Sequence, residues 1–166
     1  MIPTIILTLL IGAGLWLYMR VISPRPEFPP LHTSPDDPLL IEAMSKARAS
    51  LPQFLSLARQ PNQGALVKLH FVSSSDAVEH LWAEVLNVVS DTELDIRLIT
   101  PPVTHSGHLD RRYTCTTEDV EDWQVRDASG KLYGGFTQRA MFAIARRDGV
   151  ELPRKLRQQE RLYTDG

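Results

Sequence analysis

The residues most suited to binding a ligand lie near the C-terminal end of the chain. Gly134 and Gly135 stand before a helical pattern, where free backbone N–H groups can cradle a phosphate. The alternative is conformational, because adjacent glycines supply positive φ angles or close backbone approach where a strand turns into a helix. No Lys-Ser or Lys-Thr pair follows the glycines, so the sequence favours the conformational interpretation.

Aromatic and ionisable side chains nearby suggest a binding surface. Trp82, Trp123 and Tyr133 are large aromatics in strand-like stretches, which form either an exposed platform or part of the core. His80 shares one face of its predicted strand with Trp82. If that face is exposed, we expect His80, Trp82 and Arg139 to form a recognition surface, whereas an inward face would make His80 a core histidine. One pocket gathering these side chains with Tyr133 would indicate a small-ligand binder or a hydrolase.

The other chemical candidates are weaker. Cys115 has no catalytic motif beside it, which favours an inert strand cysteine. A metal site would use His105 and His108, joined by Asp110 or His80, but an H-x-x-H spacing in a loop lacks the helical face that sets ligand geometry. No Gly-x-Ser-x-Gly context supplies a serine nucleophile. We therefore predict no catalytic residue, no metal ligand and no cofactor.

The bulk composition is that of an ordinary globular protein with appendages. The 166 residues are 43% hydrophobic and 23% charged, which allows one domain with a sizeable core. A net charge of −2 argues against the basic footprint of a nucleic-acid-binding protein. The single cysteine excludes an internal disulfide framework.

The N-terminal segment has the pattern of a membrane anchor. Residues 2–19 contain no charged side chain and would span roughly 27 Å as a helix, close to the thickness of the bilayer hydrocarbon. Trp16 and Tyr18 stand at the end of this stretch, where aromatic rings favour the interface. The rival interpretation is a cleaved signal peptide, but no Lys or Arg precedes the apolar run and no Ala-x-Ala follows it. We predict a retained transmembrane anchor at residues 1–20, with the lipid bilayer as its partner.

Flanking charge and proline content predict how the rest of the chain is held. Arg20 and Arg25 follow the apolar span, so the positive-inside rule places the globular part in the cytoplasm. The expected location is the bacterial inner membrane, with a single span. Residues 21–37 are rich in proline, which favours a stiff stalk over a short ligand site for an SH3-like partner.

The periodicity of the remaining chain predicts helices on either side of a set of strands. Asp37-Pro38 is a strong helix start, and Pro52 interrupts the helical pattern that runs to about Arg59. Thr137 is the expected cap of a last helix, which Gly149 ends. The expected strands between these helices are residues 65–72, 78–89, 94–100, 123–126 and 131–133, with residues 112–116 as an optional short strand beside them.

Short turns between consecutive strands favour antiparallel pairing. The predicted fold class is α+β: a curved antiparallel sheet or small open barrel of about five strands, flanked by an N-terminal and a C-terminal helix. The expected domain spans residues 38–149. Residues 150–166 are expected to be a polar tail, solvated or frayed, with contact to anionic lipid headgroups as the alternative.

Three blocks of sequence resemble a known family. They are residues 42–54 (Glu-Ala-Met-Ser-Lys-Ala-Arg-Ala-Ser-Leu-Pro-Gln-Phe), the His-Leu-Trp of residues 80–82, and Asp122-Trp123 followed by residues 130–139. Together they resemble the YegJ-like bacterial family, domain of unknown function 2314, over about residues 38–142. The resemblance implies a bacterial protein of unassigned activity and supplies no catalytic residues.

The sequence thus favours a membrane-anchored, non-catalytic module that binds a protein partner or acts as an accessory protein. The alternative is a small-ligand binder or hydrolase with a pocket near the glycine pair. The residues that we expect in either binding site are His80, Trp82, Trp123, Tyr133, Gly134, Gly135 and Arg139.

Overall fold

A computed structural model describes residues 34, 36–72, 78–100 and 112–164. They belong to one unit, Thr33–Gly166. The predicted anchor at residues 2–19, most of the proline-rich stalk, and the stretch holding His105 and His108 lie outside the described residues. Among the helices that are described, none combines the length and the apolar character needed to span a bilayer.

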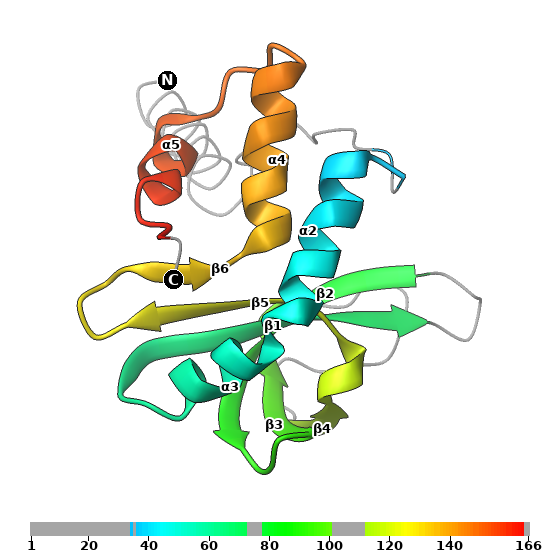
Figure 1. Ribbon diagram of the computed structural model, residues 1–166, viewed down its shortest axis with the longest axis vertical. Helices are drawn as coiled ribbons and strands as arrows, with labels where there is room; N and C mark the ends of the chain where they lie inside the picture. The colour runs from blue at the N-terminus through cyan, green and yellow to red at the C-terminus, as the bar shows by residue number, and fades with distance from the viewer. Residues whose placement is uncertain (1–33, 35, 73–77, 101–111, 165–166) are drawn as a thin grey trace, which may run out of the picture. The chain divides into compact units, whose positions relative to one another are not determined.

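The described strands form one open antiparallel sheet (Figure 1). Its six strands lie in the order β4-β3-β2-β1-β5-β6, and each neighbouring pair is antiparallel. The strands are β1 (Asn62–Val72), β2 (Val78–Val88), β3 (Glu93–Leu98), β4 (Arg112–Thr116), β5 (Val120–Asp127) and β6 (Leu132–Gly134). The predicted α+β class is confirmed. The sheet is open rather than closed into a barrel, and it has one strand more than the five expected.

The first described helix begins where the sequence indicates. Helix α2 (Pro38–Ala49) has Pro38 at its start, and the Asp37 carboxylate accepts a hydrogen bond from the backbone N–H of Leu39 at 3.0 Å. This satisfies one of the N–H groups that a helix start leaves unpaired. Ser50 ends α2, and α3 (Leu51–Ala58) follows with Pro52 in its first turn. The break predicted at this proline is confirmed.

Helices α2 and α3 cover one face of the sheet. Phe54 of α3 and Trp123 of β5 are both fully buried, with ring centroids 5.5 Å apart. Strand residues of this face alternate with outward-facing ones, as the pleat requires. The buried members from the strands are Ala65, Val67, Leu69, Leu81, Ala83, Leu94, Ile96, Leu98, Val120 and Val125.

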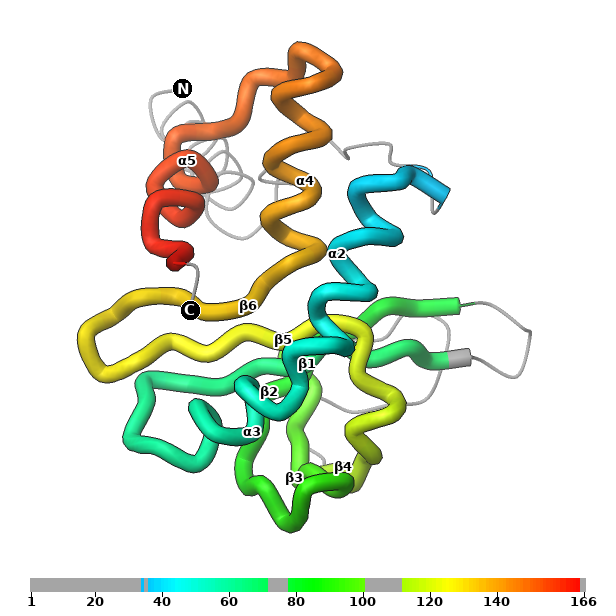
Figure 2. Tube along the Cα trace, in the orientation of Figure 1, coloured from blue at the N-terminus to red at the C-terminus, as the bar shows by residue number. Residues whose placement is uncertain are grey.

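The helix that follows β6 packs beside α2. Helix α4 (Phe136–Arg147) lies alongside α2, as Figures 1 and 2 show. Gly149 follows α4 with φ 69°, the left-handed conformation predicted for a residue just beyond a helix end. Between β4 and β5 the chain makes one short 3-10 turn, Thr117–Asp119.

The predicted frayed tail is wrong for residues 154–164. Helix α5 (Arg154–Glu160) forms there, and Glu160 pairs with Arg146 of α4. Tyr163 then makes a parallel bridge to Leu132, and its ring packs edge-on against Phe142 at 6.2 Å between centroids. The end of the chain is therefore part of the folded unit.

Candidate functional site

A groove runs between α2 and α4 and reaches β6. It consists of two adjoining depressions of about 560 and 320 Å³, which share Lys46, Phe136 and Arg139. We call this surface the α2–α4 groove. Its lining residues are Leu39, Glu42, Ala43, Lys46, Ala49, Ser50, Gln53, Tyr133, Gly134, Phe136, Arg139, Ala140, Ala143 and Thr164.

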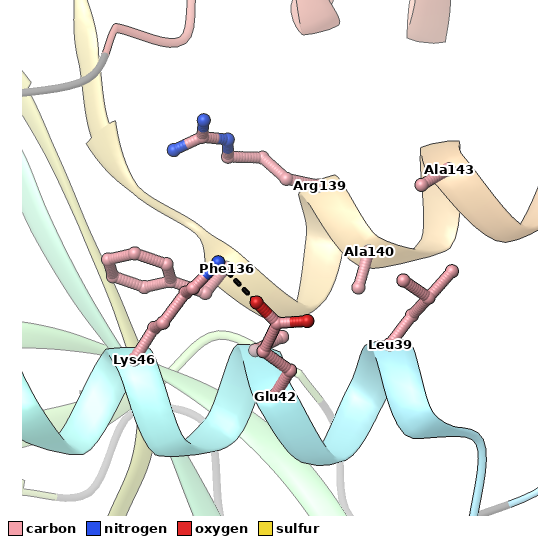
Figure 3. A pocket seen from close by; sticks show the side chains of 8 residues that line it. Leu39, Glu42, Lys46, Phe136, Arg139, Ala140 and Ala143 are labelled. Atoms are coloured by element: carbon pink, nitrogen blue, oxygen red, sulfur yellow. Dashed lines mark ion pairs between the residues drawn. The ribbon is translucent and has the colours of Figure 1, made fainter.

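Charged groups stand over an apolar floor in this groove. The ammonium group of Lys46 lies 2.6 Å from a carboxylate oxygen of Glu42, one turn away on α2, and both side chains are more than half exposed. This contact lowers the pKa of Glu42. Arg139 extends from α4, and small side chains of the same helix leave space beside Leu39 (Figure 3). The groove can therefore hold an extended apolar segment with an anionic group at its basic end.

The glycine pair is held in place by two close contacts. Gly134 has φ 75° and Gly135 has φ 62°, the left-handed region that favours glycine. A Cβ on Gly134 would lie 2.3 Å from the carbonyl oxygen of Trp123, and one on Gly135 would lie 2.5 Å from the ring of Tyr163. Both the positive φ and the close approach that the conformational interpretation predicted are confirmed.

The N–H groups of this turn already have acceptors inside the protein. Gly135 donates to the Trp123 carbonyl at 2.6 Å. Phe136 and Thr137 donate their backbone N–H groups to the two oxygens of Asp122 at 3.1 and 2.7 Å, and the Thr137 hydroxyl donates to the same carboxylate at 2.6 Å. The carboxylate of Asp122 therefore occupies the position that a phosphate would take.

The predicted cap of the last helix is also corrected by these contacts. Thr137 lies inside α4, and the cap position is held by Gly135, which has no side chain to accept a hydrogen bond. Asp122 supplies the missing acceptor from β5. Burial raises the pKa of Asp122, while hydrogen bonds from Thr137, Trp123 and Phe136 act in the opposite direction.

Trp123 belongs to the core rather than to an exposed platform. Its side chain is fully buried, and the indole N–H donates to the Ala47 carbonyl and the Ser50 hydroxyl, each at 3.1 Å. Phe136 packs edge-on against the ring at 5.7 Å between centroids. A buried indole whose N–H is satisfied fixes α2 to the sheet and leaves no surface for a ligand.

The other predicted residues divide into two places. Tyr133, Gly134 and Arg139 line the α2–α4 groove. His80 and Trp82 lie on β2, opposite His70 and Lys68 of β1, on the face that alternates with the core residues. The side chain of His80 is 49% exposed, so this face is the outward one, as the recognition-surface hypothesis requires. In the described part of the chain, the two depressions that contain Arg139 include neither His80 nor Trp82, so these residues do not share one pocket there.

A buried carboxylate lies beneath the histidine of β2. Glu121 is only 5% exposed, and its Oε2 lies 2.6 Å from Nδ1 of His80. Its Oε1 lies 3.7 Å from Nδ1 of His70. Neither Glu121 nor His70 was predicted as a site residue, because neither belongs to a recognised motif.

The remaining chemical candidates from the sequence are a reactive cysteine and a metal site. Cys115 is half-buried on β4, and burial together with the charge of Asp119 raises the pKa of its thiol to about 12. This agrees with the inert-cysteine interpretation. In the described part of the chain, no group of three or more His, Cys, Asp or Glu side chains is arranged to hold a metal ion.

The comparison with known proteins identifies the family. Residues 37–148 match the family model described as an uncharacterized protein conserved in bacteria, DUF2314. The chain belongs to this family. The resemblance to domain of unknown function 2314 is therefore confirmed, and the match extends from the cap of α2 to the end of α4. Neither a curated protein nor a solved structure matches the chain.

Proposed function

We propose that this DUF2314 protein is a non-catalytic, membrane-tethered binding module whose α2–α4 groove receives an acidic peptide segment of a protein partner. The observation that carries the proposal is the composition of the groove. Two basic side chains, Lys46 and Arg139, stand against one acidic side chain, Glu42, above small and aromatic residues. A carboxylate brought by a partner can contact these two basic side chains.

The shape of the groove supports a peptide as the ligand. Its two depressions adjoin along α2 and α4, so the combined surface is elongated. Ala140 and Ala143 leave room between the helices for apolar side chains of a bound segment (Figure 3). Tyr133 and Gln53 at the β6 end add groups that donate and accept hydrogen bonds.

Two of the blocks that carry the family resemblance meet in this groove. Glu42, Lys46, Ser50 and Gln53 come from residues 42–54, and Tyr133 to Arg139 come from residues 130–139. The third block, with His80 and Trp82, lies on a different part of the sheet. The groove is therefore the place where residues of these two blocks become neighbours.

Charge reversal in the groove tests the proposal. Peptides selected from a random display library on the full-length protein, kept in mild detergent, are expected to be enriched in Asp and Glu. Lys46→Glu and Arg139→Glu should each weaken a selected peptide about ten-fold or more, because a charge-assisted hydrogen bond contributes about 1.5–3 kcal/mol. Fluorescence anisotropy measures the affinity, and added salt should lower it.

Lys131→Glu is the matched control, because it makes the same charge change outside the groove lining. We expect the control to bind within about two-fold of the wild type. Peptides that bind the Lys46→Glu and Arg139→Glu proteins as well as the wild type would overturn the proposal. If no selected peptide depends on the groove and a small carboxylic acid binds tightly there instead, the peptide proposal fails and the groove is a small-ligand site.

The tether is a separate part of the proposal and has its own test. It rests on the uncharged stretch at residues 2–19 and on the proline-rich residues that follow. The full-length protein should stay with bacterial membranes after alkaline carbonate extraction. A reporter fused at the C-terminus should be active only as a cytoplasmic fusion, as Arg20 and Arg25 predict. Activity confined to the exported side would reverse the predicted orientation.

A further inference from the structure

Three strands bring two histidines and a carboxylate together on the outward face of the sheet. His70 of β1 and His80 of β2 are directly opposite each other in the antiparallel register. Their ring centroids are 5.6 Å apart and their planes are tilted by 45°. Both side chains are about half exposed, at 45% and 49%, whereas the Glu121 side chain beneath them is 7% exposed.

An irregularity in the sheet puts the carboxylate there. Lys68 of β1 pairs with Asp122 of β5, but Leu69 pairs with Val120, so Glu121 is an extra residue in β5. Such a bulge changes the direction of a side chain relative to the regular alternation of a strand. Here Glu121 reaches both His70 and His80.

The carboxylate fixes which nitrogen of His80 is available. Nδ1 of His80 lies 2.6 Å from Oε2 of Glu121, and in the tautomer that satisfies this contact the ring N–H at Nδ1 donates to the carboxylate. Nε2 then carries the free lone pair. A histidine that binds a metal through one nitrogen and donates the other N–H to a carboxylate has this same arrangement, in which the carboxylate orients the ring and raises its basicity.

The opposing positions of the two histidines suit a shared ion. Directly opposite residues of an antiparallel pair have Cβ atoms about 4.5–5.5 Å apart. Because a metal–nitrogen bond is about 2.0–2.1 Å long, two imidazoles from such positions reach one ion after small side-chain rotations. Both rings are half exposed, so these rotations meet little steric resistance.

We propose that His70 and His80 form a two-histidine site for a divalent transition-metal ion of the Zn²⁺ or Ni²⁺ type, with Glu121 as the positioning residue. Imidazole nitrogen is a preferred ligand of these ions. Two protein ligands leave coordination positions that water occupies. The site lies on β1 and β2, outside the α2–α4 groove, and it does not depend on the function proposed for that groove.

Metal titration of the full-length, tag-free protein tests this site. Isothermal titration with Ni²⁺ or Zn²⁺ should show one ion per chain, and His70→Ala or His80→Ala should weaken binding at least ten-fold. Glu121→Gln should weaken it about 10- to 100-fold, the usual effect of losing a carboxylate that orients a ligating histidine. Ni²⁺ should also quench the fluorescence of Trp82, which shares the face of His80 on β2.

The chain offers a control outside the described residues. His105→Ala with His108→Ala should bind the ion as the wild type does. The proposal is overturned if this double variant loses the ion, or if His70→Ala and His80→Ala both bind it unchanged. A Glu121→Gln protein with wild-type affinity would overturn the positioning role.

A second measurement uses the wild type, so it does not depend on a variant that folds. Mass spectrometry of histidine modification by diethyl pyrocarbonate should show His70 and His80 protected by Zn²⁺. An unchanged modification rate at both histidines would contradict the site. Protection of only the other histidines of the chain would place the ion elsewhere and would also contradict the proposed site.

Discussion

Two carboxylates that are neighbours in β5 have opposite roles. Asp122 is fully buried and accepts hydrogen bonds from the first turn of α4, while Glu121 is 5% exposed and faces two half-exposed histidines. The partners of Asp122 include three backbone N–H groups, which stay in place as long as the fold does. The partners of Glu121 are half-exposed imidazoles that a ligand can reach. Burial alone therefore does not distinguish a carboxylate that only holds the fold together from one that can take part in ligand binding.

The geometry of β5 explains the difference. Strand β6 pairs with β5 only from Gln124 to Arg126, so Asp122 lies beyond the end of β6, where α4 begins. Glu121 is the additional residue at the irregularity opposite β1, on the other side of the strand. Asp122 therefore contacts the start of a helix, whereas Glu121, one residue earlier, contacts side chains of two strands.

The largest expected effect is that of Asp122→Ala. It removes the acceptor of three backbone N–H groups and the Thr137 hydroxyl, so we expect a loss of about 4 kcal/mol in the free energy of unfolding. Glu121→Gln keeps the shape of the side chain and should cost about 1 kcal/mol or less. Denaturant unfolding of the two proteins measures the difference. Equal losses would show that the two carboxylates have the same structural role.

Gly134→Ala should have the next largest effect. The added methyl group would overlap the carbonyl oxygen and ring of Trp123, and the φ of 75° strains any other residue. We expect a loss of about 3 kcal/mol from strain and overlap together. Gly130→Ala is the control, since its φ is 89° but no atom lies within 4 Å of the new Cβ, and it should cost about 1 kcal/mol. Equal thermal shifts for both would contradict a close approach at Gly134.

The acidity of Asp122 gives a pH-dependent test. Burial raises the pKa of this carboxyl above its ordinary value of 3.8 in the folded state. The folded protein then holds the proton more tightly than the unfolded chain, so the stabilising contribution is complete below pH 3.8 and is lost as pH rises through the folded pKa. As pH rises through this range, the wild type should therefore lose stability relative to Asp122→Asn. A shift in favour of the wild type would mean that the hydrogen bonds outweigh burial.

The smallest effect is expected for Tyr163→Phe. The Tyr163 hydroxyl donates a 2.6 Å hydrogen bond to Gln124, while its ring covers Gly135. Losing one such bond should cost about 1 kcal/mol. Burial raises the pKa of Tyr163 to about 12, so the phenol of the wild type should resist alkaline titration until near that pH, as measured by ultraviolet absorbance. A phenol that titrates near pH 10 would show that this ring does not pack as described.

Local signals account for the parts of the fold that the sequence predicted. Asp37 and Pro38 are adjacent to the helix they start, and Pro52 marks the interruption between α2 and α3. The connections from β1 to β2 and from β2 to β3 are short, so antiparallel pairing of these strands followed from the chain itself. In these cases the deciding contact lies within a few residues along the sequence.

Contacts across long sequence separations account for the errors. The acceptor at the start of α4 comes from Asp122, fifteen residues before Thr137, so the sequence around the helix start contains only the threonine as a candidate cap. Tyr163 anchors a polar stretch through Gly135 and Phe142, and composition alone predicted a frayed tail. Tyr133, Gly134 and Arg139 were predicted together, but their neighbours from α2 were missed, because the groove depends on how two helices pack.

The bridge between Leu132 and Tyr163 also has a consequence for how the protein behaves in solution. Leu132 donates its N–H to Leu162 and accepts one from Thr164, so the end of the chain occupies part of the outer rim of β6. A protein cut back to residue 148, where the family match ends, would expose that rim. Exposed edge strands pair readily with other polypeptides. The shortened protein should therefore self-associate and precipitate at concentrations where the intact chain stays in solution.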